Sequence, residues 1–81
     1  MIARYSQDFI RQYAAAPMTV RRAFDKQVLL LLSNLRHPSL RSKKYSETGD
    51  IWQGRVNHDW RFYFSIEDDE YLLHEIKPHP K

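Results

Sequence analysis

The chain has 81 residues, of which 42% are hydrophobic and 28% charged, with a formal net charge of +3 and no cysteine. This length predicts one domain, residues 1–81, near the lower end of what folds on hydrophobic burial alone, and neither a disulfide nor a thiolate metal site can supplement its core. The N-terminus lacks the apolar region of a signal peptide, and no apolar run approaches the roughly 20 residues of a membrane span. We therefore expect a cytoplasmic protein without membrane contact.

The basic surplus lies in the first three quarters of the chain. Residues 1–35 carry five basic and two acidic side chains, residues 36–61 carry six and three, and residues 62–81 carry two and five. This distribution suits a polyanionic partner. An ordinary solvated surface with scattered lysines and arginines accounts for the charge alone equally well.

The N-terminal third predicts a short strand followed by two helices. Residues Ile2 to Tyr5 favour a strand, and the Ser6 hydroxyl is suited to cap the helix that follows. Pro17 should end this helix near Ala15 or Ala16, because the residue before a proline is pushed out of the helical region.

The second helix should begin at Pro17 and end near Leu35 or Arg36, ahead of His37-Pro38. Its apolar stripe has spacings of four, four, three and four, at Val20, Phe24, Val28, Leu31 and Leu35. Leu29, Leu30 and Leu32 widen the stripe, which predicts burial on more than one side. Two such helices form a hairpin able to cover a sheet.

The rest of the chain predicts an antiparallel meander. Residues Pro38 to Thr48 are polar and basic and indicate a loop, with a short strand at Lys44-Tyr45. The stretch from Gly49 to Ile66 alternates with period two on both sides of a turn at Asn57-His58-Asp59. One face receives the apolar residues, which we assign to the core: Trp52, Val56, Trp60, Phe62 and Phe64.

A final strand is expected over Tyr71 to Lys77, after an acidic turn at Asp68-Asp69-Glu70. By alternation Leu72, His74 and Ile76 share one face, which makes His74 a core histidine. Helices grouped ahead of a meander predict an α+β fold, in which an N-terminal strand and a helical hairpin pack on one face of a small, mainly antiparallel sheet.

Arginine and imidazole groups are the candidates for chemistry. Only two glycines are present, so no phosphate-cradling glycine loop exists, and the four histidines lack metal-ligand spacing. We expect no metal and no cofactor. Arg55 and Arg61 should face each other across the hairpin, where two guanidinium groups can hold a phosphate and offset charge on its oxygens.

Other side chains complete this cluster. Lysine or imidazole from Lys43, Lys44 or His79 could move protons, and Tyr63 or Trp52 could stack an unpaired base. Attack of a 2′-hydroxyl on its own 3′-phosphate needs only these roles. The competing interpretation is structural: the two arginines would form surface ion pairs with Asp59, Glu47 or Glu75.

With these residues in view, the chain resembles the RelE/ParE superfamily of toxins from bacterial toxin–antitoxin pairs. The resemblance runs from the helical hairpin broken at Ala16-Pro17 to the close at Ile76-Lys77-Pro78-His79. Its middle is carried by Asn34-Leu35-Arg36-His37-Pro38-Ser39-Leu40-Arg41-Ser42-Lys43-Lys44. Its most specific part is Gly49-Asp-Ile-Trp-Gln-Gly-Arg-Val-Asn-His-Asp-Trp-Arg-Phe-Tyr-Phe.

The resemblance implies a microbial RNase-like fold and, in the RelE branch, cleavage of mRNA in the ribosomal A site. By position it implies catalytic roles for five residues. Lys44 matches a basic position of the catalytic loop, Arg55 the first arginine of the hairpin and Arg61 the phosphate-stabilising arginine. Asp59 and His79 match an acidic position and the C-terminal histidine that the YafQ-like subgroup uses for catalysis. Arg41, Lys43 and Tyr63 are the further RNA-binding candidates. The YafQ-like subgroup has a histidine where Arg55 stands.

The resemblance also implies partners and leaves three functions open. A cognate antitoxin would hold the toxin silent, and the complex would bind operator DNA. The ParE branch shares the scaffold and poisons DNA gyrase. A catalytically silent module that binds its antitoxin and represses their operon fits the same residues.

Overall fold

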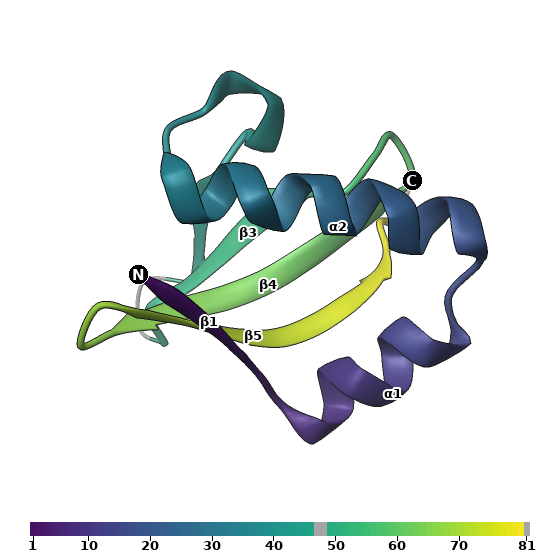
Figure 1. Cartoon of the computed structure of the whole chain (residues 1–81), viewed down its shortest axis with the longest axis horizontal. Helices are drawn as coiled ribbons and strands as arrows, with labels where there is room; N and C mark the ends of the chain where they lie inside the picture. The colour runs from purple at the N-terminus through teal and green to yellow at the C-terminus, as the bar shows by residue number, and fades with distance from the viewer. Residues whose placement is uncertain (47–48, 81) are drawn as a thin grey trace.

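A five-stranded sheet with two helices on one of its faces forms the architecture (Figure 1). The computed structural model describes residues 1–46 and 49–80. Its elements are β1 (Ile2–Tyr5), α1 (Gln7–Ala15), α2 (Met18–Ser33), the 3₁₀ turn η1 (Pro38–Leu40), β2 (Lys43–Ser46), β3 (Ile51–Arg55), β4 (Trp60–Glu67) and β5 (Glu70–Pro78). The strand order is β1-β5-β4-β3-β2; β1 runs parallel to β5 and every other pair is antiparallel. The predicted α+β fold is confirmed.

The first helix has the ends that the sequence predicts. The Ser6 hydroxyl accepts from the backbone N–H of Phe9 at 3.0 Å and donates to the carbonyl of His74, so the cap also ties α1 to β5. The chain leaves the helix at Ala16, which is extended ahead of Pro17.

The second helix packs its stripe against the sheet. Val20, Phe24, Val28 and Leu31 are buried, and Phe24 meets Phe62 of β4 edge-on at 5.4 Å between ring centroids. The helix ends at Ser33, two residues before the earlier of the expected ends, because Asn34 adopts an extended conformation. The prediction that this helix is buried on more than one side is wrong at Leu29, which is 67% exposed.

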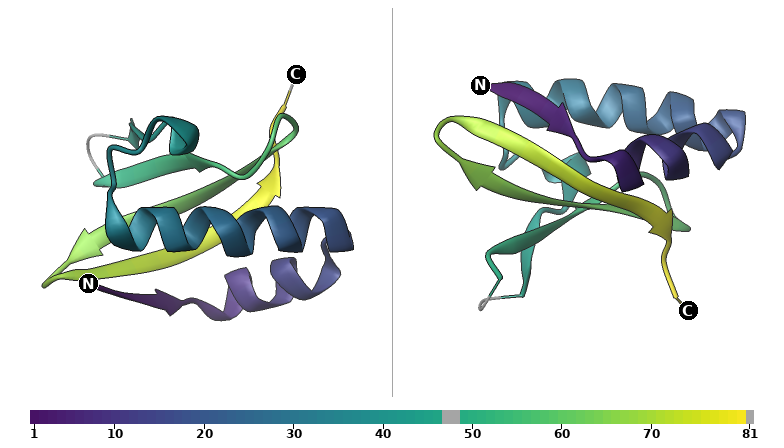
Figure 2. Two further views of the ribbon diagram at one scale, coloured as in Figure 1. Left: turned by 45° about the horizontal axis from the view of Figure 1, so that its top comes forward. Right: turned by 90° about the horizontal axis from the view of Figure 1, so that it is seen from below.

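The core lies between the two helices and one face of the sheet. The right half of Figure 2 shows both helices on the same side of the sheet. Its fully buried large side chains come from every layer: Phe9, Phe24, Leu31, Leu40, Phe62, Phe64, Leu73 and Ile76. Complete burial of one such side chain contributes about 1.5–3 kcal/mol. Trp52 and Trp60 pack against this core while partly exposed, which confirms the predicted apolar face.

Gly54 lets β3 and β4 approach over the core. It pairs with Phe62, and a Cβ at this position would lie 2.3 Å from the Cζ atom of that ring. Only glycine therefore leaves room for the phenylalanine beneath it.

The last strand differs from prediction in the direction of its side chains. Tyr63 pairs with Glu75 but Phe64 pairs with Leu73, so His74 is an extra residue in a β-bulge. The bulge brings Tyr71 and Leu73 to the core beside Ile76. The expected core histidine is wrong: His74 is half-buried and bonds Ser65 Oγ at 2.8 Å on the opposite face.

The β4–β5 hairpin closes through an acidic two-residue turn. Glu67 pairs with Glu70, and Asp68 and Asp69 between them have φ angles of 46° and 64°, as a type I′ turn requires. The predicted acidic turn is confirmed. Among the described residues, no helix has the length and apolarity needed to cross a membrane.

Candidate functional site

Three cationic residues lie in register across three neighbouring strands. Arg55 of β3 pairs with Arg61 of β4, which pairs with Lys77 of β5, so adjacent Cα atoms are about 5 Å apart. We call Arg55, Arg61 and Lys77 the basic row, and the side of the sheet away from the helices the open face. Like charges directly opposite one another destabilise a sheet. The direct opposition of Arg55 and Arg61 is therefore unfavourable for the sheet, and a bound anion would offset it.

The guanidinium of Arg61 is held beside the β3–β4 turn. Its Nη1 donates to the carbonyls of Asn57 at 2.6 Å and Trp60 at 2.9 Å. Burial lowers the pKa of Arg61 below its ordinary value, and the charges of Arg55 and Arg41 lower it further. The three arginines therefore share one region of positive potential, which a bound anion would relieve.

A cleft of about 500 Å³ opens beside Arg55, between α2, η1 and the end of β3. Three of the residues that line it are cationic: Lys26, Arg41 and Arg55. Arg41 has a φ of 46° in the left-handed region, which costs an ordinary residue about 1–2 kcal/mol. Backbone strain of this kind is common at functional sites.

Buried Gln27 fixes the walls of this cleft. Its Nε2 donates to the carbonyls of Ser39 at 3.0 Å and Arg55 at 2.8 Å, and its Oε1 accepts from the Ser39 hydroxyl at 3.0 Å. The sequence alone assigned no role to Gln27 or Lys26. Gln27 was recognisable, because it stands on the apolar stripe three residues after Phe24, where a polar side chain has to find partners.

The C-terminal segment lies against the β3–β4 turn. The backbone N–H of His79 donates to the carbonyl of Asp59 at 2.7 Å, which continues the β4–β5 register by one more pair beyond Trp60 and Pro78. Asp59 and His79 therefore lie beside each other, each two residues along the backbone from Arg61 or Lys77. The structure thus brings four of the five predicted catalytic residues to one corner.

The fifth, Lys44, lies elsewhere. It pairs with Trp52, whose ring stacks on Phe64 on the helix side, and its Nζ is 3.4 Å from Asp50 Oδ1. The expected grouping of Lys44 with the arginines is therefore not found. Lys43 pairs with Gln53 and so shares the open face with the basic row.

The predicted base-stacking residues are also covered. Tyr63 lies on the open face but is 5% exposed, beneath the ring of Tyr45 at 5.0 Å and the Nζ of Lys77 at 5.1 Å. Gln53 Nε2 donates to its hydroxyl at 3.2 Å. A base cannot stack on a ring that is covered in this way, and Trp52 faces the core.

Of the three carboxylates named in the competing ion-pair interpretation, Asp59 acts on Arg61, because its charge raises the pKa of that guanidinium. Glu75 pairs with Lys77 at 3.3 Å, and Glu47 lies outside the described residues. Within residues 1–46 and 49–80 the ion pairs involve Arg4, Arg11, Lys44 and Lys77, and neither Arg55 nor Arg61 takes part in one.

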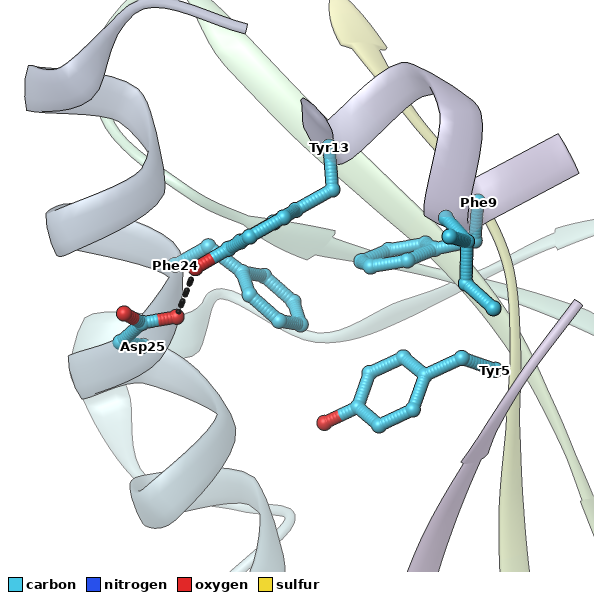
Figure 3. Close-up of a pocket in the computed structure, with 6 residues that line it drawn as sticks. Tyr5, Phe9, Tyr13, Phe24 and Asp25 are labelled. Carbon is cyan, nitrogen blue, oxygen red and sulfur yellow. Dashed lines mark hydrogen bonds between the residues drawn. The ribbon is translucent and has the colours of Figure 1, made fainter. Parts of the chain in front are cut away.

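A second hollow, apolar and about 300 Å³ in volume, lies between β1, α1 and α2 (Figure 3). Rings of Tyr5, Phe9, Tyr13 and Phe24 form its walls, and the Tyr13 hydroxyl donates to Asp25 Oδ1 at 2.8 Å. None of the predicted site residues lines it. This hollow is therefore separate from the basic row and from the other predicted site residues.

Solved structures of toxins share the fold of this chain. The YoeB/ParE toxin from Agrobacterium tumefaciens superposes with a TM-score of 0.82 at 8% identity, over 99% of this chain and 100% of that one. YafQ from E. coli strain BL21(DE3) gives 0.79 at 16% identity, over 95% and 91%. The archaeal RelE–RelB complex from Pyrococcus horikoshii OT3 gives 0.76 at 18% identity, over 95% and 91%. No family model and no curated protein matches the sequence.

These superpositions define the class of fold: a small α+β domain with an N-terminal strand, two helices and a mainly antiparallel sheet. It is the fold of the RelE/ParE toxins, and it extends over nearly the whole chain. The resemblance seen in the sequence is confirmed at the level of the fold.

Proposed function

We propose that this chain is the toxin of a toxin–antitoxin pair and that it inhibits translation in the cytoplasm by cleaving mRNA in the ribosomal A site. The observation that carries the proposal is the basic row. Arg55 and Arg61 are directly opposed across β3 and β4, at a cost to the sheet, and they take no part in the ion pairs of the described residues. Sites that break the rules of stable folding are expected where a protein acts.

In this mechanism Arg55 and Arg61 bind the scissile phosphate and offset the negative charge that grows on its oxygens. A base removes the proton of the adjacent 2′-hydroxyl, and its oxygen attacks phosphorus. The bond from phosphorus to the 5′-oxygen breaks, and an acid protonates that leaving oxygen. The products are a 2′,3′-cyclic phosphate and a 5′-hydroxyl.

His79 is the proposed proton-transfer residue, since its backbone is anchored beside the row at Asp59. Asp59 is proposed to orient it. Lys43 replaces Lys44 as the nearby lysine because it stands on the open face, and Arg41 extends the cationic surface along the cleft. These roles divide the reaction into phosphate binding and proton transfer.

A cognate antitoxin is the proposed protein partner. Support comes from solved toxin–antitoxin complexes with the same fold, such as the P. horikoshii RelE–RelB complex and the YoeB–YefM complex from Staphylococcus aureus. Binding of operator DNA by the pair is part of the same proposal.

The test is induction of the full chain in a bacterial host, with growth, primer extension on mRNA and gyrase supercoiling activity measured together. Growth arrest with new mRNA ends inside codons supports the proposal, and Arg61→Ala should remove both. Arg11→Ala is the matched control, because it deletes the same charge from the surface of α1. Inhibited supercoiling with intact mRNA would instead identify a gyrase inhibitor, and binding of an antitoxin without either effect a silent module.

Arg61→Ala also removes the hydrogen bonds of Arg61 to the turn carbonyls. Urea unfolding of the variant therefore accompanies the assay. Arg55→Ala repeats the test at the second arginine, because among the described contacts the Arg55 guanidinium makes no such bond to the turn. Equal toxicity of both variants and the parent contradicts the proposed phosphate site.

A further inference from the structure

Tyr45 presents an exposed aromatic ring on the open face, next to the basic row. It stands at the register shift of edge strand β2, between Lys44 and Ser46, and it is 61% exposed. Its ring meets the ring of Tyr63 at 5.0 Å and 65°. Since Tyr63 lies on the open face, Tyr45 lies there too. A large exposed aromatic ring on a basic surface is unexplained by packing.

Tyr63 supports this ring from the sheet side. It is itself nearly buried, its hydroxyl accepts from Gln53, and Lys77 lies over its ring at 5.1 Å. Edge-to-face contact with a fixed ring orders an exposed one. The Tyr45 ring is therefore fixed by its contact with Tyr63, while most of its surface remains open to solvent.

The position of Tyr45 matches an RNA strand that crosses the basic row. Tyr63 and Arg61 point the same way on β4, two residues or about 7 Å apart. Tyr45 is beside Tyr63, and Lys43 comes two residues before it on β2. A single strand whose phosphate is bound at Arg55 and Arg61, and which runs along the open face toward β2, thus reaches Lys43 and then the open ring of Tyr45.

We propose that Tyr45 is the base-stacking residue of this site and takes one unpaired base of the RNA next to the phosphate held by the basic row. The inference rests on the proposed function, and assigns to Tyr45 the role that Tyr63 and Trp52 cannot fill. Stacking accepts any base, because every base has a π-face. Tyr45 therefore contributes affinity and strand direction, and codon choice lies with other groups.

The test is fluorescence anisotropy of the full chain with a labelled single-stranded oligoribonucleotide that carries a 2′-O-methyl group at every sugar and so cannot be cleaved. Loss of one stacked base raises Kd about 5- to 150-fold. Tyr45→Ala should show this loss. Tyr45→Phe keeps a ring and should bind like the parent, whereas Tyr45→Leu keeps apolar contact with Tyr63 and should bind like the alanine variant.

Two further measurements separate stacking from a structural role. The slope of log Kd against log salt should not change in Tyr45→Ala, because no phosphate contact is lost, whereas Arg61→Ala should lower it by about 0.7. An oligonucleotide that is abasic throughout should bind parent and Tyr45→Ala alike. Urea unfolding checks that each variant is folded.

The outcomes distinguish this inference from the function on which it rests. If Arg61→Ala weakens binding but Tyr45→Ala does not, stacking by Tyr45 is refuted and the phosphate site stands. If Tyr45→Phe loses as much affinity as Tyr45→Ala, the hydroxyl and not the ring is responsible, and stacking is again refuted. If the parent neither binds nor cleaves RNA, the proposed function and this inference both fail.

Discussion

Gln27 joins the second helix to the candidate site, and its removal should loosen both. The side chain is 6% exposed and makes three hydrogen bonds, two to carbonyls of Ser39 and Arg55 and one with the Ser39 hydroxyl. These bonds hold η1 and the end of β3 against α2. Gln27→Leu deletes all three while keeping a side chain of similar size.

The expected loss follows from what each partner can do without Gln27. Ser39 is exposed, so water can replace its bonds, and each then costs about 0.5 kcal/mol. The Arg55 carbonyl is turned toward the helix and loses a donor, at about 1–3 kcal/mol. Together the free energy of unfolding should fall by about 2–4 kcal/mol. Total stability of a chain this size is about 4–12 kcal/mol, so the change is large.

Urea unfolding followed by tryptophan fluorescence measures this loss, with an unchanged m-value as the sign that the unfolded state is the same. Gln7→Leu is the matched control, because Gln7 is exposed at the start of α1, and it should stay within about 0.5 kcal/mol of the parent. A Gln27→Leu protein as stable as the parent would refute the reasoning, since the three bonds would then contribute nothing net.

Two further changes test the sheet. Gly54→Ala should lower the free energy of unfolding by about 1–3 kcal/mol, because the added methyl group meets the buried Phe62 ring. Gly49→Ala is the control and should be nearly neutral in the same urea experiment, because the nearest neighbour of its Cβ would lie at 3.5 Å. Burial raises the pKa of the Tyr71 phenol above 10, so its ionisation opposes folding. The contribution of this phenol to stability should be constant below pH 10 and fall above it. Above pH 10 the free energy of unfolding should therefore fall less steeply in Tyr71→Phe than in the parent, and parallel slopes in urea titrations up to about pH 11.5 would contradict this.

The sequence predicts the elements of this fold because their signals are local. The Ser6 cap and the Pro17 break set both ends of α1, and the alternation from Trp60 to Phe64 assigns the core face of β4. The side-chain directions of β5 do not follow from the local sequence. They depend on one extra residue, His74, opposite the step from Tyr63 to Phe64, and period-two counting contains no sign of it.

The candidate site likewise contains residues whose positions the sequence predicts and residues whose positions it does not. The opposed arginines follow from the hairpin register, which the alternation and the turn specify. Lys44 and Tyr63 depend instead on the edge strand β2: its register turns Lys44 toward the helix side, and its Tyr45 covers Tyr63. No periodicity in residues 43–46 is long enough to reveal that pairing. The sequence does place Gln27 on the buried stripe of the helix, but it does not reveal which distant groups its side chain bonds.

The acidic turn at one end of the β4–β5 hairpin and the basic residues at its other end separate charge along the hairpin. Glu67, Asp68, Asp69 and Glu70 cluster at the tip, and Arg61 and Lys77 lie six or seven residues away along the same two strands, about 20 Å distant. Such a separation of charge is a permanent dipole aligned with the hairpin. In the field of a polyanion it rotates the molecule before contact, with the acidic tip outward and the arginines leading. The length of the two strands therefore sets how far apart the two charges lie, and with it how strongly a polyanion would orient the molecule.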